Sequence, residues 1–362
     1  MAANRNLIRI WWQVVLILAV TGADASFREE PPFYAEKSQL LYYLDQQGGR
    51  HAVGTRADWA IRRGHILANM QRVMGPLPPK TRKPLDVRVV EEVRVGQMTR
   101  KKLTFVSEDG DRVPAYLFLP PQRSKRGPAV LCLHQTTRIG KGEPAGIGGL
   151  ANLHYAKELA ERGYVTLAPD YPNFGDYQVD PYAMGYASAT MKGISNHIRA
   201  VDFLVSLPEV DPKRIGVIGH SLGGHNSLFL AVFEPRVRVV VTSCGFNSFA
   251  KHHGGDLTGW SHKGYMPRIA SIYEKSPEKM PFDFTEVLGA IAPRPVFINA
   301  PLKDEDFEVS GVEDCVNAAL PVYVQIFHVG DRLVVVHPDC AHDFPPDIRE
   351  QAYKFLDRWL KP

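Results

Sequence analysis

The chain has 362 residues, 44% of them hydrophobic, which is enough for a sizeable packed core in one large or two small domains. Its formal net charge is +4, and its longest basic run is Arg100-Lys101-Lys102. The electrostatic footprint of a nucleic-acid-binding protein is therefore absent, and the composition indicates an ordinary globular protein.

The N-terminus has the layout of a cleavable signal peptide. Arg5 and Arg9 form a basic end, an apolar run follows over residues 10–20, and Ala23 and Ala25 supply the small residues of a cleavage site. A retained membrane anchor or a buried helix would use the same run, but it is shorter than the roughly 20 apolar residues that cross a bilayer. We therefore predict a signal peptide over residues 1–25, a secreted or periplasmic location, and no stable membrane span after cleavage.

Residues 26–80 are predicted to form an N-terminal helical extension with two helices. The clearer helix covers Ala57 to Met74, where apolar residues recur at helical spacing, and Gly75-Pro76 ends it. The region from Val87 to Leu119 then alternates apolar and polar residues around a turn at residues 108–111. This alternation predicts antiparallel strands with one face in water.

From Ala129 the pattern changes to short continuous apolar runs that alternate with helical stretches. A buried parallel sheet that is covered by helices on both faces has this pattern. The sequence therefore predicts an α/β fold whose central sheet is mostly parallel, with an antiparallel N-terminal edge. The expected strands are residues 129–133, 164–168, 214–218, 237–242, 295–299 and 332–336, and the expected helices are residues 150–162, 182–207, 222–233, 312–327 and 346–360.

One catalytic domain is expected over residues 81–362, with an insertion at about residues 246–290 that fits no predicted element. Loops this long are uncommon in compact domains and are often functional. The insertion leaves from the carboxyl edge of the predicted sheet, where ligands bind in open α/β folds. Trp260 is therefore predicted to bind substrate, and the alternative is that it only packs the insertion onto the domain.

The sequence Gly219-His220-Ser221-Leu222-Gly223-Gly224 lies directly between a predicted strand and a predicted helix. A G-x-S-x-G sequence in this context describes a nucleophile elbow, a strained turn that exposes the serine hydroxyl and requires glycines beside it. Ser221 is therefore the predicted nucleophile. The Leu222 N–H, at the N-terminus of the helix, is a predicted oxyanion donor.

A serine hydroxyl needs a base to remove its proton and a carboxylate to orient that base. With such an elbow the chain order is serine, acid, histidine. His342 follows the last predicted strand and is the expected base. Asp304 and Asp306 both follow the strand over residues 295–299. Asp304 is favoured as the acid because its turn from the strand is shorter, and Asp306 is the alternative.

Together these segments resemble the α/β-hydrolase superfamily, and within it the bacterial proteins called dienelactone-hydrolase-like or acetyl xylan esterase-like. The resemblance covers residues 57–360 and rests on residues 133–137, 159–164, 168–171, 219–224 and 338–344. It implies a second oxyanion donor two residues beyond His134, the N–H of Thr136, with Gln135 as the alternative. True dienelactone hydrolases have a cysteine nucleophile, so Ser221 favours simple esters over dienelactones.

The resemblance implies a serine carboxylesterase that acts on a small-molecule or carbohydrate ester through an acyl-enzyme. A prolyl-oligopeptidase-like peptidase shares the order of the three residues, but the region before Ala129 is too short and unrepetitive for the N-terminal propeller of those enzymes. An inactive α/β-hydrolase that serves as a binding module is the third alternative, although Ser221 and His342 are both in place.

No cofactor and no metal is expected. The polar residues of the insertion lack the spacing of a metal site. The sequence leaves open the oligomeric state and a disulfide between Cys315 and Cys340. The insertion residues considered as metal ligands are His252, His253, Asp256 and His262.

Overall fold

The computed structural model describes residues 30–81, 83–121 and 126–361. Residues 31–362 form one compact unit, so residues 31–80 of the predicted N-terminal extension belong to the same unit as the predicted catalytic domain. The predicted signal peptide lies outside the described residues. Among the residues described, no helix is long and apolar enough to cross a membrane.

A central sheet carries the fold, and nine strands of the described chain form it in the order β11-β10-β9-β8-β6-β7-β5-β4-β3. The strands from β6 onward pair in parallel, whereas β3, β4 and β5 form an antiparallel edge that joins the sheet through β7. This confirms the predicted α/β class. The strands are β3 Arg88–Val95, β4 Met98–Glu108, β5 Asp111–Leu119, β6 Gly127–Leu133, β7 Val165–Pro169, β8 Val210–His220, β9 Val237–Ser243, β10 Val296–Asn299 and β11 Leu333–Val336.

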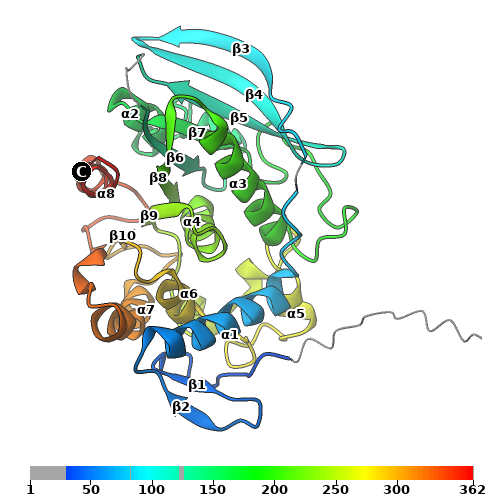
Figure 1. Ribbon diagram of the computed structural model, residues 1–362, viewed down its shortest axis with the longest axis vertical. Helices are drawn as coiled ribbons and strands as arrows, with labels where there is room; N and C mark the ends of the chain where they lie inside the picture. Colours follow the sequence, from blue (N-terminus) through cyan, green and yellow to red (C-terminus); the bar gives the residue numbers. More distant parts are fainter. Residues whose placement is uncertain (1–29, 82, 122–125, 362) are drawn as a thin grey trace, which may run out of the picture. The chain divides into compact units, whose positions relative to one another are not determined.

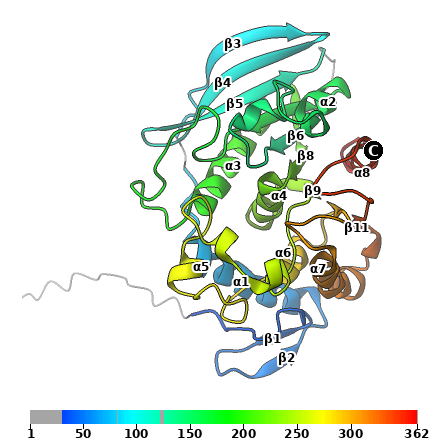
Figure 2. The ribbon, with the colours of Figure 1, turned by 180° about the vertical axis from the view of Figure 1, so that it is seen from behind.

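Helices cover both faces of the sheet (Figures 1 and 2). Helices α2 and α8 pack on one face, and α3 and α4 pack on the other, which is why β6 and β9 are apolar on both sides. Helix α4 is buried nearly all round, so its sequence shows no polar face. These helices are α2 Tyr155–Glu161, α3 Ala189–Ser206, α4 Leu222–Phe233 and α8 Pro346–Leu360.

The N-terminal segment holds one of the two predicted helices. Helix α1, Arg56–Met74, begins at a capping box in which Thr55 and Asp58 satisfy each other's backbone N–H groups. The second predicted helix is wrong, because β1, Tyr42–Leu44, pairs antiparallel with β2, Arg50–Ala52. Asp45 stabilises the intervening turn by accepting hydrogen bonds from two backbone N–H groups.

The predicted insertion contains regular structure that its sequence did not reveal. Short helix α5, Arg268–Ser271, is followed by α6, Phe284–Ile291, which opens with a capping box between Asp283 and Glu286. Every residue of α6 is buried, and the helix packs against α1, α4 and α7, Val309–Pro321. The insertion therefore contributes a core helix as well as loops.

Candidate active site

Ser221 occupies the tight turn between β8 and α4. Its backbone φ of 52° and ψ of −117° lie in a region that residues with a side chain rarely adopt. A Cβ atom at Gly219 would lie 2.1 Å from the carbonyl oxygen of Gly223, and a Cβ at Gly223 would lie 1.9 Å from that of Leu133. Glycine at both positions therefore allows the strand, the turn and the helix to approach closely enough to form the elbow.

His342 and Asp304 form a hydrogen-bonded pair at the carboxyl edge of the sheet. The two oxygens of Asp304 lie 2.9 and 3.0 Å from His342 Nδ1, and the Asp304 side chain is almost completely buried. The carboxylate also accepts hydrogen bonds from the N–H groups of Asp306 and Phe307. Burial alone would raise the pKa of Asp304, but the contacts with His342 and the two N–H groups hold it below its ordinary value.

Asp306 is less well placed to orient the histidine. Its nearest carboxylate oxygen lies 3.8 Å from His342 Nδ1, and its side chain is 62% exposed. A distance of 3.8 Å is too long for a hydrogen bond. Of the two acids considered from the sequence, the structure brings only Asp304 into bonding distance of His342.

The His342 ring lies beside the elbow. Its centroid is 4.8 Å from that of His220, the residue before Ser221, and its side chain is partly exposed. The Ser221 N–H is fixed by Ser243 O at 2.8 Å. Among the described residues, no hydrogen bond joins Ser221 Oγ to His342 Nε2. Such catalytic hydrogen bonds are often long without substrate and shorten in the substrate complex.

Two residues that were not predicted from the sequence hold the loop that carries His342 against the sheet. Asn299, the last residue of β10, donates from Nδ2 to Asp343 O at 2.9 Å and to Ser243 Oγ at 2.8 Å. The Cys244 thiol donates to the same Asp343 carbonyl. The sequence signal is a polar residue at the end of an apolar strand, at the edge where the predicted acid and base also lie.

The two candidate oxyanion donors lie on neighbouring segments. The Leu222 N–H opens α4. The first N–H groups of a helix have no partner within it. The loop after β6 approaches the elbow closely, since a Cβ on Gly223 would also meet His134 O at 2.9 Å. This loop carries Thr136, whose hydroxyl lies 3.4 Å from Tyr265 Oη.

His134 fixes the peptide that presents the Thr136 N–H. Its Nδ1 lies 2.6 Å from Gln135 O, and its Nε2 accepts from the Tyr171 N–H at 2.9 Å. Burial lowers the pKa of His134, so the ring is neutral and Nδ1–H is the donor to Gln135 O. Because C=O and N–H point in opposite directions across a trans peptide, this bond turns the Thr136 N–H away from His134.

Trp260 lies in an aromatic cluster within the core. Its side chain is 3% exposed. Burial of this degree favours the packing role for Trp260 over the predicted contact with substrate. The surrounding rings, with centroids 4.8 to 6.1 Å from that of Trp260, are His225, Phe249, His252, Tyr265, Phe284 and Phe307.

The Trp260→Ala variant is expected to lose about 3 to 5 kcal/mol of unfolding free energy, because truncation leaves a cavity among these rings. The kcat/KM of the folded fraction for a small ester should stay within a few-fold of the parent value. Chemical denaturation together with steady-state kinetics would measure both quantities. A stable variant with a strongly raised KM would instead place Trp260 in the substrate site.

All four cysteines are free, so Cys315 and Cys340 form no disulfide. In the described part of the chain, one group of three potential metal ligands comes within 4.8 Å of one another, namely Cys244, Asp304 and His342. Two of these three are the acid and base, which already bind each other. The histidines and the aspartate of the insertion form no such group among the described residues.

Part of the chain matches a known protein family. Residues 113–256 match the dienelactone hydrolase family. The chain is 27% identical over 303 residues to the YtaP protein of Bacillus subtilis, which is described as a hydrolase; the match covers 80% of this chain and 97% of that relative.

Two solved structures are similar to the chain. The glucuronoyl esterase from Solibacter usitatus aligns with a TM-score of 0.69 and 19% identity, covering 91% of this chain and 98% of that one. Acetyl xylan esterase 1 from Thermoanaerobacterium sp. JW/SL YS485 aligns with a TM-score of 0.55 and 21% identity, covering 76% and 88%. At these identities the likeness shows the fold, which is that of the α/β-hydrolases.

Proposed function

We propose that this chain, whose residues 113–256 match the dienelactone hydrolase family, is an exported serine esterase that acts on carbohydrate esters through an acyl-enzyme. The family match and the esterases among similar proteins indicate a carboxylic ester hydrolase. The observation that carries the proposal is the strained Ser221 elbow next to the Asp304–His342 pair.

In the proposed reaction, Ser221 Oγ attacks the ester carbonyl carbon while His342 Nε2 takes the hydroxyl proton. Asp304 holds Nδ1–H, so Nε2 is free to accept that proton. The N–H groups of Leu222 and Thr136 stabilise the resulting oxyanion. His342 then gives the proton to the leaving alcohol as the carbon–oxygen bond breaks. A water molecule, activated by the same histidine, hydrolyses the acyl-enzyme and restores Ser221.

The substrate class is proposed from the similar proteins. One is a glucuronoyl esterase and another is an acetyl xylan esterase, so both names describe enzymes that act on carbohydrate esters. In a glucuronoyl ester the sugar supplies the acyl group. In acetyl xylan the sugar supplies the alcohol. The serine at the elbow supports ester cleavage, since a serine nucleophile with a histidine base forms acyl-enzymes.

A hydrolysis screen of the purified mature protein tests this function. The substrates are p-nitrophenyl esters of varied chain length, acetylated xylan, methyl glucuronate and aminoacyl amides. We expect turnover of the short p-nitrophenyl esters and of at least one carbohydrate ester, with little turnover of the amides. Turnover of amides alone would contradict the esterase assignment and favour a peptidase.

Export is proposed from the N-terminal pattern described above. Mature protein from the native host is expected to begin at or near Ser26 and to occur outside the cytoplasm, because a signal peptidase would cut after Ala25. N-terminal sequencing of the protein from fractionated cells measures this. A protein that starts at Met1 in the soluble cytoplasmic fraction would refute export.

A further inference from the structure

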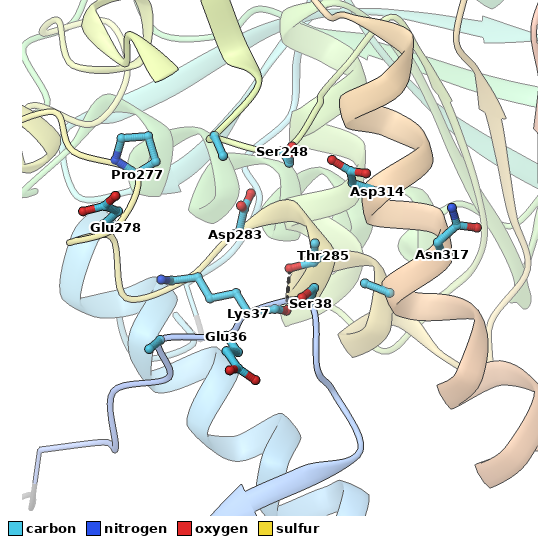
Figure 3. Close-up of a pocket in the computed structure, with 13 residues that line it drawn as sticks. Glu36, Lys37, Ser38, Ser248, Pro277, Glu278, Asp283, Thr285, Asp314 and Asn317 are labelled. Atoms are coloured by element: carbon cyan, nitrogen blue, oxygen red, sulfur yellow. Dashed lines mark hydrogen bonds between the residues drawn. The ribbon is translucent and has the colours of Figure 1, made fainter. Parts of the chain in front are cut away.

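A pocket of about 660 Å³ lies outside the acid–base pair and the elbow. Three parts of the chain line it: the N-terminal segment of residues 35–38, the insertion with its helix α6, and helix α7 (Figure 3). Thr285 Oγ1 donates to Lys37 O at 2.8 Å, which fixes the N-terminal segment against α6. This contact keeps two of the segments that line the pocket in place.

The pocket is on the side of the sheet where substrates bind. Helix α7 follows β10, so its first turns lie at the carboxyl edge of the sheet. Helix α6 runs into the start of β10, so its N-terminus, at Asp283, points to the same edge. Ser248 lies five residues beyond the end of β9, and its N–H donates to Gly311 O on α7. In open α/β folds this edge carries the ligand site.

Two polar side chains in this pocket form no side-chain hydrogen bond with a described residue, and the polar atom of one of them, Ser248, is fully buried. Lys37 is 7% exposed, and its ammonium makes no hydrogen bond or ion pair there; it lies 4.8 Å from the centroid of the Phe33 ring. Ser248 is 5% exposed, and its Oγ has no partner. Figure 3 shows Lys37 reaching across the pocket below Asp283. A buried polar group without a partner is costly, so the Ser248 hydroxyl indicates that something else binds there. The Lys37 ammonium keeps accessible surface and is therefore open to a ligand that enters the pocket.

The carboxylates of the pocket have partners but are not saturated, since a carboxylate offers about four acceptor positions. Asp283 accepts hydrogen bonds from the N–H groups of Phe284 and Phe249, and burial raises its pKa to about 7. Asp314 is paired with Lys251 at 2.9 Å. Carboxylates and an ammonium thus share one pocket. A ligand that carries a net charge of either sign would meet a like charge.

Hydroxyl groups suit this arrangement. Each one can accept from the Lys37 ammonium or the Ser248 hydroxyl and donate to a carboxylate oxygen. A neutral sugar presents several such hydroxyls and no charge, and the pocket has room for at least one sugar ring. We propose that this pocket is a subsite that binds a neutral sugar residue of the substrate, away from the ester that is cleaved. The proposal rests on the proposed function.

Binding of oligosaccharides that carry no ester tests the subsite separately from catalysis. The protein is the full mature chain with Ser221→Ala, and the probes are xylohexaose, cellohexaose and mannohexaose, titrated by calorimetry. We expect at least one probe to bind. Adding Lys37→Met should weaken its Kd by about tenfold or more, and adding Ser248→Ala by a few-fold, since hydrogen bonds from charged donors are the stronger ones.

The matched control is Lys354→Met, because Lys354 is an exposed lysine on α8. It should leave the Kd unchanged. Lys37→Met should not lower the melting temperature, since the ammonium it removes has no ion pair. In the chain with Ser221 intact, Lys37→Met should raise KM for an acetylated xylo-oligosaccharide, whereas Lys354→Met should leave that KM unchanged.

Failure of the subsite and failure of the proposed function give different results. If none of the three probes binds, or if Lys37→Met and Ser248→Ala bind them as tightly as the parent, the subsite proposal is overturned whatever the hydrolysis screen shows. If a probe binds through Lys37 but no ester is cleaved, the sugar site stands and the esterase proposal fails.

Discussion

Replacing Ser221 with alanine is expected to lower kcat/KM for p-nitrophenyl acetate by about a million-fold, as for nucleophile deletions in serine hydrolases. The reason is that no other group at the elbow can form the acyl-enzyme. The melting temperature should change little, because only a partly exposed hydroxyl is removed. Steady-state kinetics on protein free of wild-type contamination, with a thermal melt of the same sample, measures both quantities.

Ser206→Ala is the matched control for this prediction. Ser206 ends α3, and its Oγ donates to Phe203 O, so the variant removes a serine hydroxyl from a different part of the fold. Its kcat/KM should stay close to the parent value. If Ser221→Ala retained more than a few per cent of the parent activity, the nucleophile would have to be another residue.

The second large effect is expected for Asp304→Asn, which should lower kcat by about 10,000-fold. The buried carboxylate accepts the His342 Nδ1–H and so leaves Nε2 as the base. An amide at this position can donate to Nδ1, which would hold the wrong tautomer. The pH–rate profile and kcat of the purified variant measure this loss.

Asp306→Asn is the control for the acid, because it changes a neighbouring carboxylate whose side chain is mostly exposed. Its kcat should stay within about tenfold of the parent, as expected for a screened surface charge. A large loss in Asp306→Asn with an active Asp304→Asn would move the role of the acid to Asp306.

Strong local signals made much of the fold predictable. The expected helices over residues 222–233 and 346–360 agree with α4 and α8 at both ends, since a glycine-rich turn precedes one and Pro345-Pro346 begins the other. The parallel strands were visible as apolar runs because helices cover both of their faces. The elbow was visible because its glycines are required sterically.

Features that depend on tertiary contacts were not predictable. Helix α6 is only eight residues long, and a helical period is hard to recognise in an apolar segment shorter than about 10 residues. Strands β1 and β2 have three residues each, too few for an alternation to be recognised. The burial of Trp260 depends on rings from α4, α6 and the Asp304 loop, which the sequence alone does not bring together.

In the site, too, local sequence signals were predictive, whereas tertiary contacts were not predictable. The G-x-S-x-G turn selected Ser221, and chain order with position after a strand selected Asp304 and His342 as candidates. The distances from His342 Nδ1 to the carboxylates of Asp304 and Asp306 differ by only about 1 Å. The backbone turn after β10 determines this difference, so the sequence alone could not decide between the two acids. Asn299 was missed because its contact with Asp343 O joins positions 44 residues apart.

Covalent labelling with a fluorophosphonate, followed by peptide mapping, tests the central claim most directly. An activated serine reacts with this reagent, whereas unactivated serines do not. We predict one labelled residue, Ser221, with labelling abolished in the Ser221→Ala variant and strongly slowed in Asp304→Asn. Labelling at a different serine, or no labelling of a folded protein, would contradict the account.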